Sequence, residues 1–402
     1  MGRSLKVAFF LAGRAIGRGH VRVSILSISV MVLVYINIAL GPALIDGLVD
    51  LINHKVRTTL SGDIVVQSDG TTDYLLEAGA LVSQIEAVDG VAAAVPLTLV
   101  GYQVRHEGRQ FTSTLTAADP DDYRSVFATA DYLIEGSFLE PEDTGQVVLG
   151  IGVAGADREF DSSWASLRTI NAGDRITVTL ASGTAREYTV KGIFQTEMPY
   201  SDIKAFITRR ELAIISPGSA DTANQVCVRA EGGRELGPIA RQIQGLRQGL
   251  SVGTWEEVAG MVQATVESVR SIYFIIQVIA LAVAGLTIAM VTYIDLANRR
   301  RQMGILRGIG ITDRSLILSY TFRALFLYAA GTLMALVLFA FVIVPLERQH
   351  PLHVSFGDIL LPVEVSYLLT AAALLCVVSL FSAAIPAWQA TRVQVVDAIW
   401  AG

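Results

Sequence analysis

The sequence predicts a membrane α-helical protein with four transmembrane helices, one plus three, and a large α+β extracytoplasmic domain between the first and the second. Of its 402 residues, 52% are hydrophobic and 17% are charged, whereas soluble domains have about 25% charged residues. Four apolar runs reach the roughly 20 residues that a helix needs to cross a bilayer. The charge is also uneven, because residues 46–270 hold 18 basic and 31 acidic side chains while the remainder holds 13 and 6.

The predicted transmembrane helices occupy residues 21–44, 271–294, 316–344 and 365–387. The third contains a charged side chain, Arg323, roughly 10 Å inside its first end. An arginine at this depth can extend its guanidinium to the membrane surface. We therefore expect Arg323 to snorkel rather than to mark an intramembrane ion pathway, which is the alternative.

Loop charges predict the orientation of these helices, because cytoplasmic loops carry an excess of lysine and arginine. Basic residues precede the first helix and fill the loop 295–315, whereas the loop 345–364 is mostly acidic. Both termini are thus expected in the cytoplasm, residues 45–270 outside, and the chain in the cytoplasmic (inner) membrane. Residues 388–402 are then a cytoplasmic tail. Arginines spaced by four residues predict that segment 1–20 is an amphipathic helix lying on membrane lipid. These arginines are Arg14, Arg18 and Arg22.

The segment 45–270 has the alternating patterns of a mixed α and β domain. Helical spacing occurs at 75–88 and 234–246, and the two strands 175–180 and 187–194 read as a hairpin. Its net negative charge argues against nucleic-acid binding, which needs clustered basic residues. The remaining strands are expected at 63–67, 91–102, 111–115, 145–149, 226–229 and 250–254.

Catalytic and metal-binding patterns are weak in this sequence. None of its four lysines follows a glycine, so there is no P-loop and ATP hydrolysis is expected in a partner subunit. Ser201 and Lys204 fit the S-x-x-K pattern of some hydrolases, but the companion motifs are missing. We expect no catalytic, metal or cofactor site; turn chemistry and isolated side chains account for Asp119, Asp121, Asp122, His350, His353, Cys227 and Cys376.

The loop between the second and third spans has the composition of a docking element. Gly304 and Gly310 permit close approach of another backbone, and Ile305 and Leu306 form an apolar surface beside Arg307. A short helix of this kind is suited to binding in a partner's groove. An ordinary loop on the membrane surface would have a similar composition.

The same loop resembles the signature of FtsX-like permeases, the MacB and lipoprotein-release type of ABC transporter subunit. That family carries R-x-x-E-[IF]-G-x-L-[RK]-[AS]-[IL]-G, and this chain has R-R-Q-M-G-I-L-R-G-I-G, with Gln302 in place of the acid. The tail is similar to the family's P-x-x-x-A pattern at Pro386 and Ala390; Ala398 also matches, and Val395 replaces a proline. LIEGSFLEPEDTGQVVLGIGVA and INAGDRITVTL…YTVKGIF resemble strands of the family's outer domain, whose topology is the same.

The resemblance implies a permease that couples ATP hydrolysis in a cytoplasmic ABC ATPase, which holds ATP and magnesium, to movement of its outer domain. It implies a dimer with a second permease, contact between the ATPase and Gly304, Ile305, Leu306, Arg307 and Gly310, and an extracytoplasmic acceptor or adaptor. The implied outputs are release or export of lipoproteins, lipids or other amphiphiles, or control of an external cell-wall hydrolase. A membrane-anchored hydrolase and a receptor are the alternatives of another class.

One outer-domain segment, GIFQTEMPYSDIKAF, is similar to part of the lipoprotein-release permeases. The resemblance makes its central residues a candidate contact for substrate or partner: Met198, Pro199, Tyr200 and Asp202. The second span, which continues outward through residues 256–270, is expected to act as a stiff lever because it lacks glycine and proline from 261 to 284.

Overall fold

The structure is a computed structural model that describes residues 21–106, 108–155, 167, 170–181, 183–219, 221–298, 305, 311–354 and 357–391. The chain divides into two compact units. The helical unit comprises residues 1–49, 265–352 and 358–402, and the α+β unit comprises residues 50–264 and 353–357. The predicted segment 1–20, tail residues 392–402 and Gly304, Leu306, Arg307 and Gly310 lie outside the described residues.

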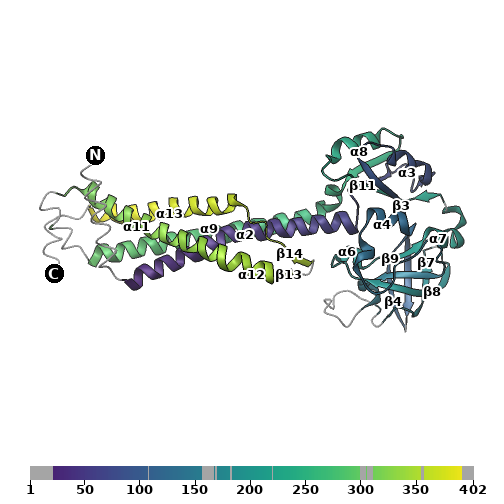
Figure 1. The fold of residues 1–402 in the computed structure, drawn as a ribbon, viewed down its shortest axis with the longest axis horizontal. Coiled ribbons are helices and arrows are strands. Elements are labelled where there is room, and N and C mark those ends of the chain that lie inside the picture. The colour runs from purple at the N-terminus through teal and green to yellow at the C-terminus, as the bar shows by residue number, and fades with distance from the viewer. Residues whose placement is uncertain are drawn as a thin grey trace. The chain divides into compact units, whose positions relative to one another are not determined.

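Four helices are long and apolar enough to cross a membrane (Figure 1). They are α2 (Val21–Thr59), α9 (Trp255–Asn298), α11 (Asp313–Leu338) and α13 (Val365–Thr391). After α11 come a π-helical turn labelled η3 (Phe339–Ile343), α12 (Val344–Gln349), and the hairpin strands β13 (Leu352–Val354) and β14 (Gly357–Ile359). The predicted fold class, one spanning helix, an α+β domain and three further helices, is confirmed.

The helix α2 is longer than its predicted span, since it continues to Thr59 instead of ending near residue 44. Pro42 lies inside the helix without ending it. Beyond Pro42 the helix still buries apolar side chains, including Ile45, Ile52 and Val56. Burial of this kind, rather than the width of a bilayer, therefore determines where the helix ends.

Small residues bring the helices of the helical unit together. A methyl group on Gly41 would collide with the ring of Tyr273 on α9, and one on Gly331 would lie 2.9 Å from Met31 Cβ. The carboxylate of Asp46 accepts bonds from Arg270 at 2.8 Å and from the Tyr367 hydroxyl at 2.7 Å.

Arg323 does not reach the surface, contrary to the snorkelling that the sequence predicts. It is 8% exposed and lines a small internal space of the helical unit with Ser27, Thr292 and Tyr320. Polar side chains from neighbouring helices give a buried guanidinium an environment that a lone helix in lipid would not offer.

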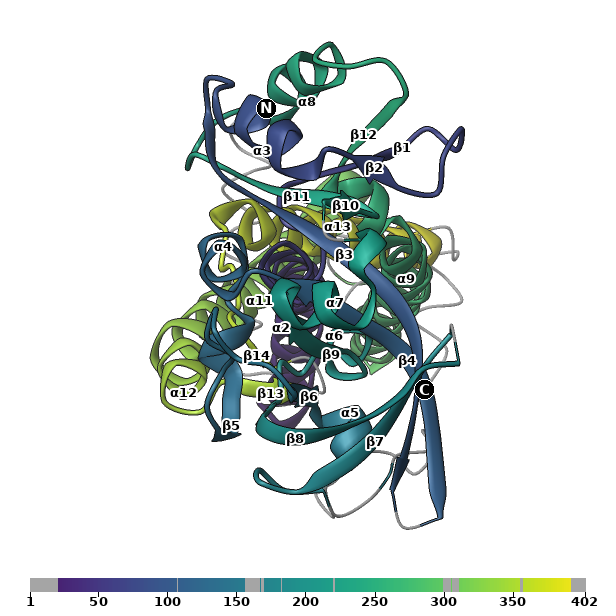
Figure 2. The same cartoon turned by 90° about the vertical axis from the view of Figure 1, so that its right-hand side faces the viewer.

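The α+β unit contains two linked strand–helix arrangements. In the first, β1 (Ile64–Ser68), α3 (Ala78–Glu86) and the first half of β3 (Val91–His106) combine with β11 (Gln225–Ala230), α8 (Leu236–Gln244) and β12 (Leu250–Thr254). The strand order β12-β1-β11-β3 is antiparallel throughout, as in split β-α-β folds. Figure 2 shows α3 and α8 next to each other beside these strands, and Ile85 and Ile243 are fully buried in the core that they share.

The second arrangement is inserted between β3 and β11 and closes on itself. The second half of β3 pairs with β4 (Arg109–Ala118) and with β7 (Arg175–Leu180). The ring continues through β9 (Ala205–Thr208), β6 (Gln146–Gly150) and β8 (Ala185–Phe194) back to β7. A closed ring of six strands has no free edges, and its interior holds the largest apolar core of the unit, with Leu149 and Val190 at its centre.

The predicted strands and helices of this unit are present, with bounds that differ by a few residues, and β7 with β8 forms the predicted hairpin. Short elements escape sequence reasoning because they have too few residues to show a period. They are β2 (Leu75–Leu76), α4 (Pro120–Val126), η1 (Thr129–Tyr132), β5 (Leu133–Gly136), α5 (Ile151–Ala154), α6 (Pro199–Asp202), β9, α7 (Arg209–Ile215), η2 (Pro217–Ser219) and β10 (Thr222–Ala223).

Candidate functional site

The last turns of α2 are fixed inside the α+β unit by two polar clusters, which together we call the junction. The first consists of Arg57 and Asp63, and the second of Lys55, Thr196, Glu197 and Asp202. All of these residues belong to the α+β unit. The helix α2 is one of the four helices long and apolar enough to cross a membrane, and its residues from Asp50 onward belong to the α+β unit.

Asp63 is hydrogen-bonded to three segments of the unit. Its Oδ1 accepts a bond from Arg57 Nε at 2.6 Å, and its Oδ2 accepts one from the Ala230 N–H at 2.9 Å. Its carbonyl accepts the N–H of Trp255, the first residue of α9, at 3.0 Å. The Asp63 side chain is only 1% exposed, whereas that of Arg57 is 42% exposed, and the two bonds to the Asp63 carboxylate are charge-assisted. The end of α2, the end of β11 and the start of α9 are therefore held at one residue.

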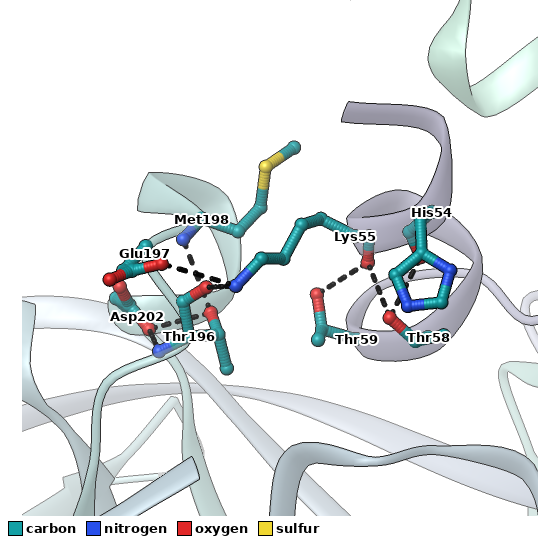
Figure 3. A network of polar contacts seen from close by, with 8 residues as sticks. All are labelled: His54, Lys55, Thr58, Thr59, Thr196, Glu197, Met198 and Asp202. Carbon is teal, nitrogen blue, oxygen red and sulfur yellow. Dashed lines mark hydrogen bonds and ion pairs between the residues drawn. The ribbon is translucent and has the colours of Figure 1, made fainter. Parts of the chain in front are cut away.

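Lys55 forms the second cluster by reaching from α2 to the segment before α6, as Figure 3 shows. Its Nζ donates to the Thr196 carbonyl at 2.8 Å and to Glu197 Oε2 at 3.3 Å. It also lies 4.4 Å from the ring centroid of Tyr132, a cation–π distance. The lysine side chain is 6% exposed, so its charge is compensated almost entirely by these groups.

Asp202 organises the other side of this cluster. Its Oδ1 accepts bonds from the Thr196 N–H at 2.7 Å and from the Thr196 hydroxyl at 2.8 Å. Asp202 is fully buried, and burial raises the pKa of this carboxyl to about 6 although its hydrogen bonds and Lys55 act in the opposite direction. The bonds hold the loop at Glu197 in a left-handed conformation, with φ at 60°, which a glutamate adopts only at a cost.

The loop between α11 and α13 contributes to the same cluster. Residues 353–357 belong to the α+β unit by their contacts. Gly357 has φ at +117°, and a Cβ built there would lie 2.7 Å from Glu197 Oε2. Glycine is favoured at this position by its backbone conformation, and a side chain there would also displace the end of the Glu197 side chain.

The four outer-domain residues that the sequence predicts as contacts differ in their exposure to solvent. Tyr200 is 51% exposed, whereas Met198 is 1% exposed and Asp202 is fully buried; Pro199 is half-buried. The surface of this segment is thus provided by Tyr200, and the buried residues act within the unit. Of the five residues predicted to contact an ATPase, Ile305 is the one that the structure describes, as a helical residue 53% exposed.

The structure also shows the hydrogen bonds of other residues that the sequence singles out. The Ser201 hydroxyl is buried and donates to the Thr59 carbonyl at 3.3 Å, at the end of α2. Asp119 caps α4 by accepting bonds from the N–H groups of Asp121 and Asp122, as the predicted turn chemistry requires. Lys55, Asp63 and Thr196 were missed, because a single lysine or aspartate in a sequence gives no sign of its long-range partner.

The raised pKa of Asp202 predicts a pH dependence of stability. The folded unit binds this proton more tightly than the unfolded chain, whose pKa is near 3.8. The stability contribution is therefore highest below about pH 4, falls as pH rises towards 6, and stays low above it. This decrease in the free energy of unfolding is on the order of 3 kcal/mol. We expect it to be absent in Asp202→Asn, which keeps an oxygen that accepts from Thr196 but does not titrate. Thermal unfolding of the solubilised chain at pH 4, 5 and 7.5 measures it.

The exposed residue Asp73 provides the control for this measurement. Asp73→Asn should follow the pH profile of the unaltered chain. If Asp202→Asn and Asp73→Asn show the same profile, the proton of Asp202 makes no difference to folding and the assignment is wrong.

Comparisons with known proteins find similarity to membrane permeases and to solved outer domains. A family model described as FtsX-like permease C-terminal matches residues 274–395. A protein of Methanocaldococcus jannaschii described as an uncharacterized ABC transporter permease is 23% identical over 264 residues, covering 64% of this chain and 63% of that relative. The chain thus matches less than two thirds of the length of this curated relative.

Solved outer domains of two transporters are similar to part of this chain. The extracellular domain of the noncanonic ABC-type transporter YknZ from Gram-positive bacteria has a TM-score of 0.34 and 13% identity, and covers 48% of this chain and 99% of that one. The periplasmic region of MacB from Actinobacillus actinomycetemcomitans has a TM-score of 0.36 and 10% identity, and covers 52% of this chain and 95% of that one.

Proposed function

We propose that this chain is an ABC transporter permease of the FtsX and MacB type that moves its outer unit by means of a separate ATPase. The match of residues 274–395 to the FtsX-like permease family and the similarity to an ABC transporter permease support this proposal. The membrane chain itself supplies no P-loop, so ATP and magnesium belong to that partner. The proposed work is release or export of an amphiphile such as a lipid or a lipoprotein, at the cytoplasmic membrane with both termini in the cytoplasm.

The observation that carries this proposal is the junction. Two helices long and apolar enough to cross a membrane, α2 and α9, each extend beyond their apolar stretch into the α+β unit. There Asp63 bonds to Arg57 of α2 and to the first residue of α9, and Lys55 bonds to the segment before α6. A displacement of either helix is therefore transmitted to strands and loops through hydrogen bonds to the buried groups of Asp63, Lys55 and Thr196. Such stiff connections are what coupling between a cytoplasmic motor and an outer domain needs.

The ATPase partner is proposed to bind the loop 295–315. Copurification of the tagged chain from detergent, followed by an ATPase assay, tests this step. We expect Leu306→Asp and Arg307→Glu each to lose at least tenfold of the bound ATPase, because a charge reversal or a buried carboxylate disrupts an apolar anchor in a groove. Arg348→Gln, which changes an exposed arginine of α12 outside this loop, is the control and should retain the partner.

The absence of any copurifying ATPase would contradict the transporter function. A receptor or a membrane-anchored hydrolase would then be the better interpretation. The hydrolase predicts activity of the chain without ATP that disappears in Ser201→Ala.

A second permease copy is proposed as a further partner. The helix α9 exposes large apolar side chains, with Phe274 at 64% and Leu286 at 70%. Lipid and a second copy are both suited to such a surface. Cysteine cross-linking through Leu286→Cys in membranes distinguishes them, since only a paired copy gives a covalent dimer.

Control of an external cell-wall hydrolase remains a second candidate output. It would use the same junction, but the moving unit would act on a bound hydrolase instead of a transported amphiphile. The exposed Tyr200, beside the buried part of the junction, is the position where such an acceptor is expected to bind.

A further inference from the structure

A surface cavity of about 500 Å³, widely open to solvent, lies in the α+β unit on the side of α4 and η1. Ligand sites of proteins typically have volumes of about 300–1,000 Å³. Its wall contains two aromatic rings, Phe127 and Phe138, and two guanidinium groups, Arg124 and Arg229. Leu133 and Ser137 also line it. In a segment with 18 basic and 31 acidic residues, two arginines at one cavity are a local exception.

Hydrogen bonds to backbone carbonyls hold both arginines in place, but only Arg124 is also paired with a carboxylate in the described residues. Arg229 donates to the Val126 carbonyl at 2.7 Å, and within the described residues it has no carboxylate partner. Arg124 donates to the Leu139 carbonyl at 2.8 Å and to Asp121 at 3.1 Å, and it lies 5.5 Å from the ring centroid of Phe138. Each guanidinium has five N–H donors, so the carbonyl bonds orient the groups and leave donors for a ligand.

The apolar part of the wall is also ordered. Phe127 and Phe138 are 3% and 6% exposed and both stack on the buried ring of Tyr123, at centroid distances of 4.7 and 5.8 Å. Asp131 lines the cavity as well and is exposed. With Asp121 paired to Arg124 and Asp131 nearby, the charges favour a ligand with one negative charge over one with two.

We propose that this cavity binds a monoanionic amphiphile, with a phosphodiester or carboxylate head at Arg229 and Arg124 and an apolar portion against the half-buried Leu133 and Ala130, which lie over the buried rings of Phe127 and Phe138. Arginine suits such a head because its planar donors match two oxygens at once. This inference rests on the proposed transport function and names the chemical class of its substrate.

The cavity is also connected to the junction. The N–H of Ala128, in its wall, donates to the Thr58 carbonyl of α2 at 2.9 Å. Four residues further along, the ring of Tyr132 contacts the Lys55 ammonium. A ligand that moves the wall from Phe127 to Leu133 therefore changes two contacts of α2, which gives substrate occupancy a path to the transmembrane helix.

Calorimetric titration of the full chain, held in amphipol, tests the site. The probes are dihexanoyl phosphatidylglycerol below its micelle concentration, decanoate, inorganic phosphate and a neutral maltoside. We expect the phosphatidylglycerol or decanoate to bind at least tenfold more tightly than phosphate or maltoside. Arg229→Gln should weaken this binding at least tenfold, Arg229→Lys should restore part of it, and Ala130→Trp should block the cavity. Arg241→Gln, which changes an exposed arginine of α8, should have no effect.

Two results would overturn the site. Equal affinity of the Arg229→Gln or Ala130→Trp chain and the unaltered chain means that binding occurs elsewhere. Equal binding of phosphate and lipid means a plain anion site without amphiphile recognition. Because no ATPase takes part, these outcomes are independent of the copurification that tests the transporter itself, so either proposal can fail alone.

Discussion

Gly150→Ala is expected to destabilise the α+β unit by about 3 kcal/mol or more, a large effect for one methyl group. Gly150 ends β6, and a Cβ built there would lie 2.1 Å from the carbonyl oxygen of Asp202 and 2.5 Å from its carbon. Its φ of −72° suits any residue, so the cost is steric and not conformational. The colliding atoms belong to the backbone of α6, which no rotamer change can move away.

The consequence of this clash reaches the junction. To admit the methyl group, α6 must shift away from β6, and the Asp202 carboxylate then loses the two bonds that it accepts from Thr196. We expect the melting temperature of the solubilised chain to fall by roughly 6–12 °C. Gly237→Ala is the matched control: it adds the same methyl group to α8 with no atom within 4 Å, and alanine favours a helix. Equal melting temperatures for both variants would show that β6 and α6 are not in close contact.

Sequence reasoning recovers the features that have a period or a charge asymmetry. The apolar runs predict the four helices, and alternation predicts strands such as β7 and β8. It cannot locate the end of α2, because Pro42 reads as a helix end while the buried side chains of Ile52 and Val56 continue the helix. Closure of the six-stranded ring depends on β9, a run of four fully buried residues, Ala205–Thr208, whose pattern has no alternation to detect.

The sequence predicts one segment of the candidate site, but as a contact for substrate or partner and not as part of a buried hydrogen-bond cluster. A family-like segment points to residues 198–202, and the structure does place an organising residue there, Asp202. In the same cluster Glu197 pairs with Lys55, which lies 142 residues away in the sequence, and nothing local to either residue indicates the pair. The exposed position, Tyr200, is the part of the predicted contact that is available to another molecule.

Lys55→Met is expected to uncouple ATP hydrolysis from movement of the outer unit. Methionine retains the apolar stem but removes the ammonium, which leaves the buried Thr196 carbonyl without its donor and Glu197 without its partner. Loss of one partner of a buried pair costs about 3–5 kcal/mol; because Glu197 is 32% exposed, we expect about 2–3 kcal/mol here. The segment 196–202 would then no longer follow the end of α2.

Hydrogen exchange of the complete complex, with and without ATP, separates this uncoupling from simple loss of stability. In the unaltered chain ATP should change the exchange of residues 196–202 severalfold. In Lys55→Met this change should disappear while ATPase binding persists.

Lys191→Met is the matched control, because it also removes an ammonium from an ion pair of the α+β unit, with Asp143, but one that makes no contact with α2. If Lys191→Met loses the ATP-dependent change as well, general destabilisation explains the effect. If only Lys55→Met loses it, force passes from α2 to the outer unit through this lysine, and Asp63 alone is not a sufficient connection.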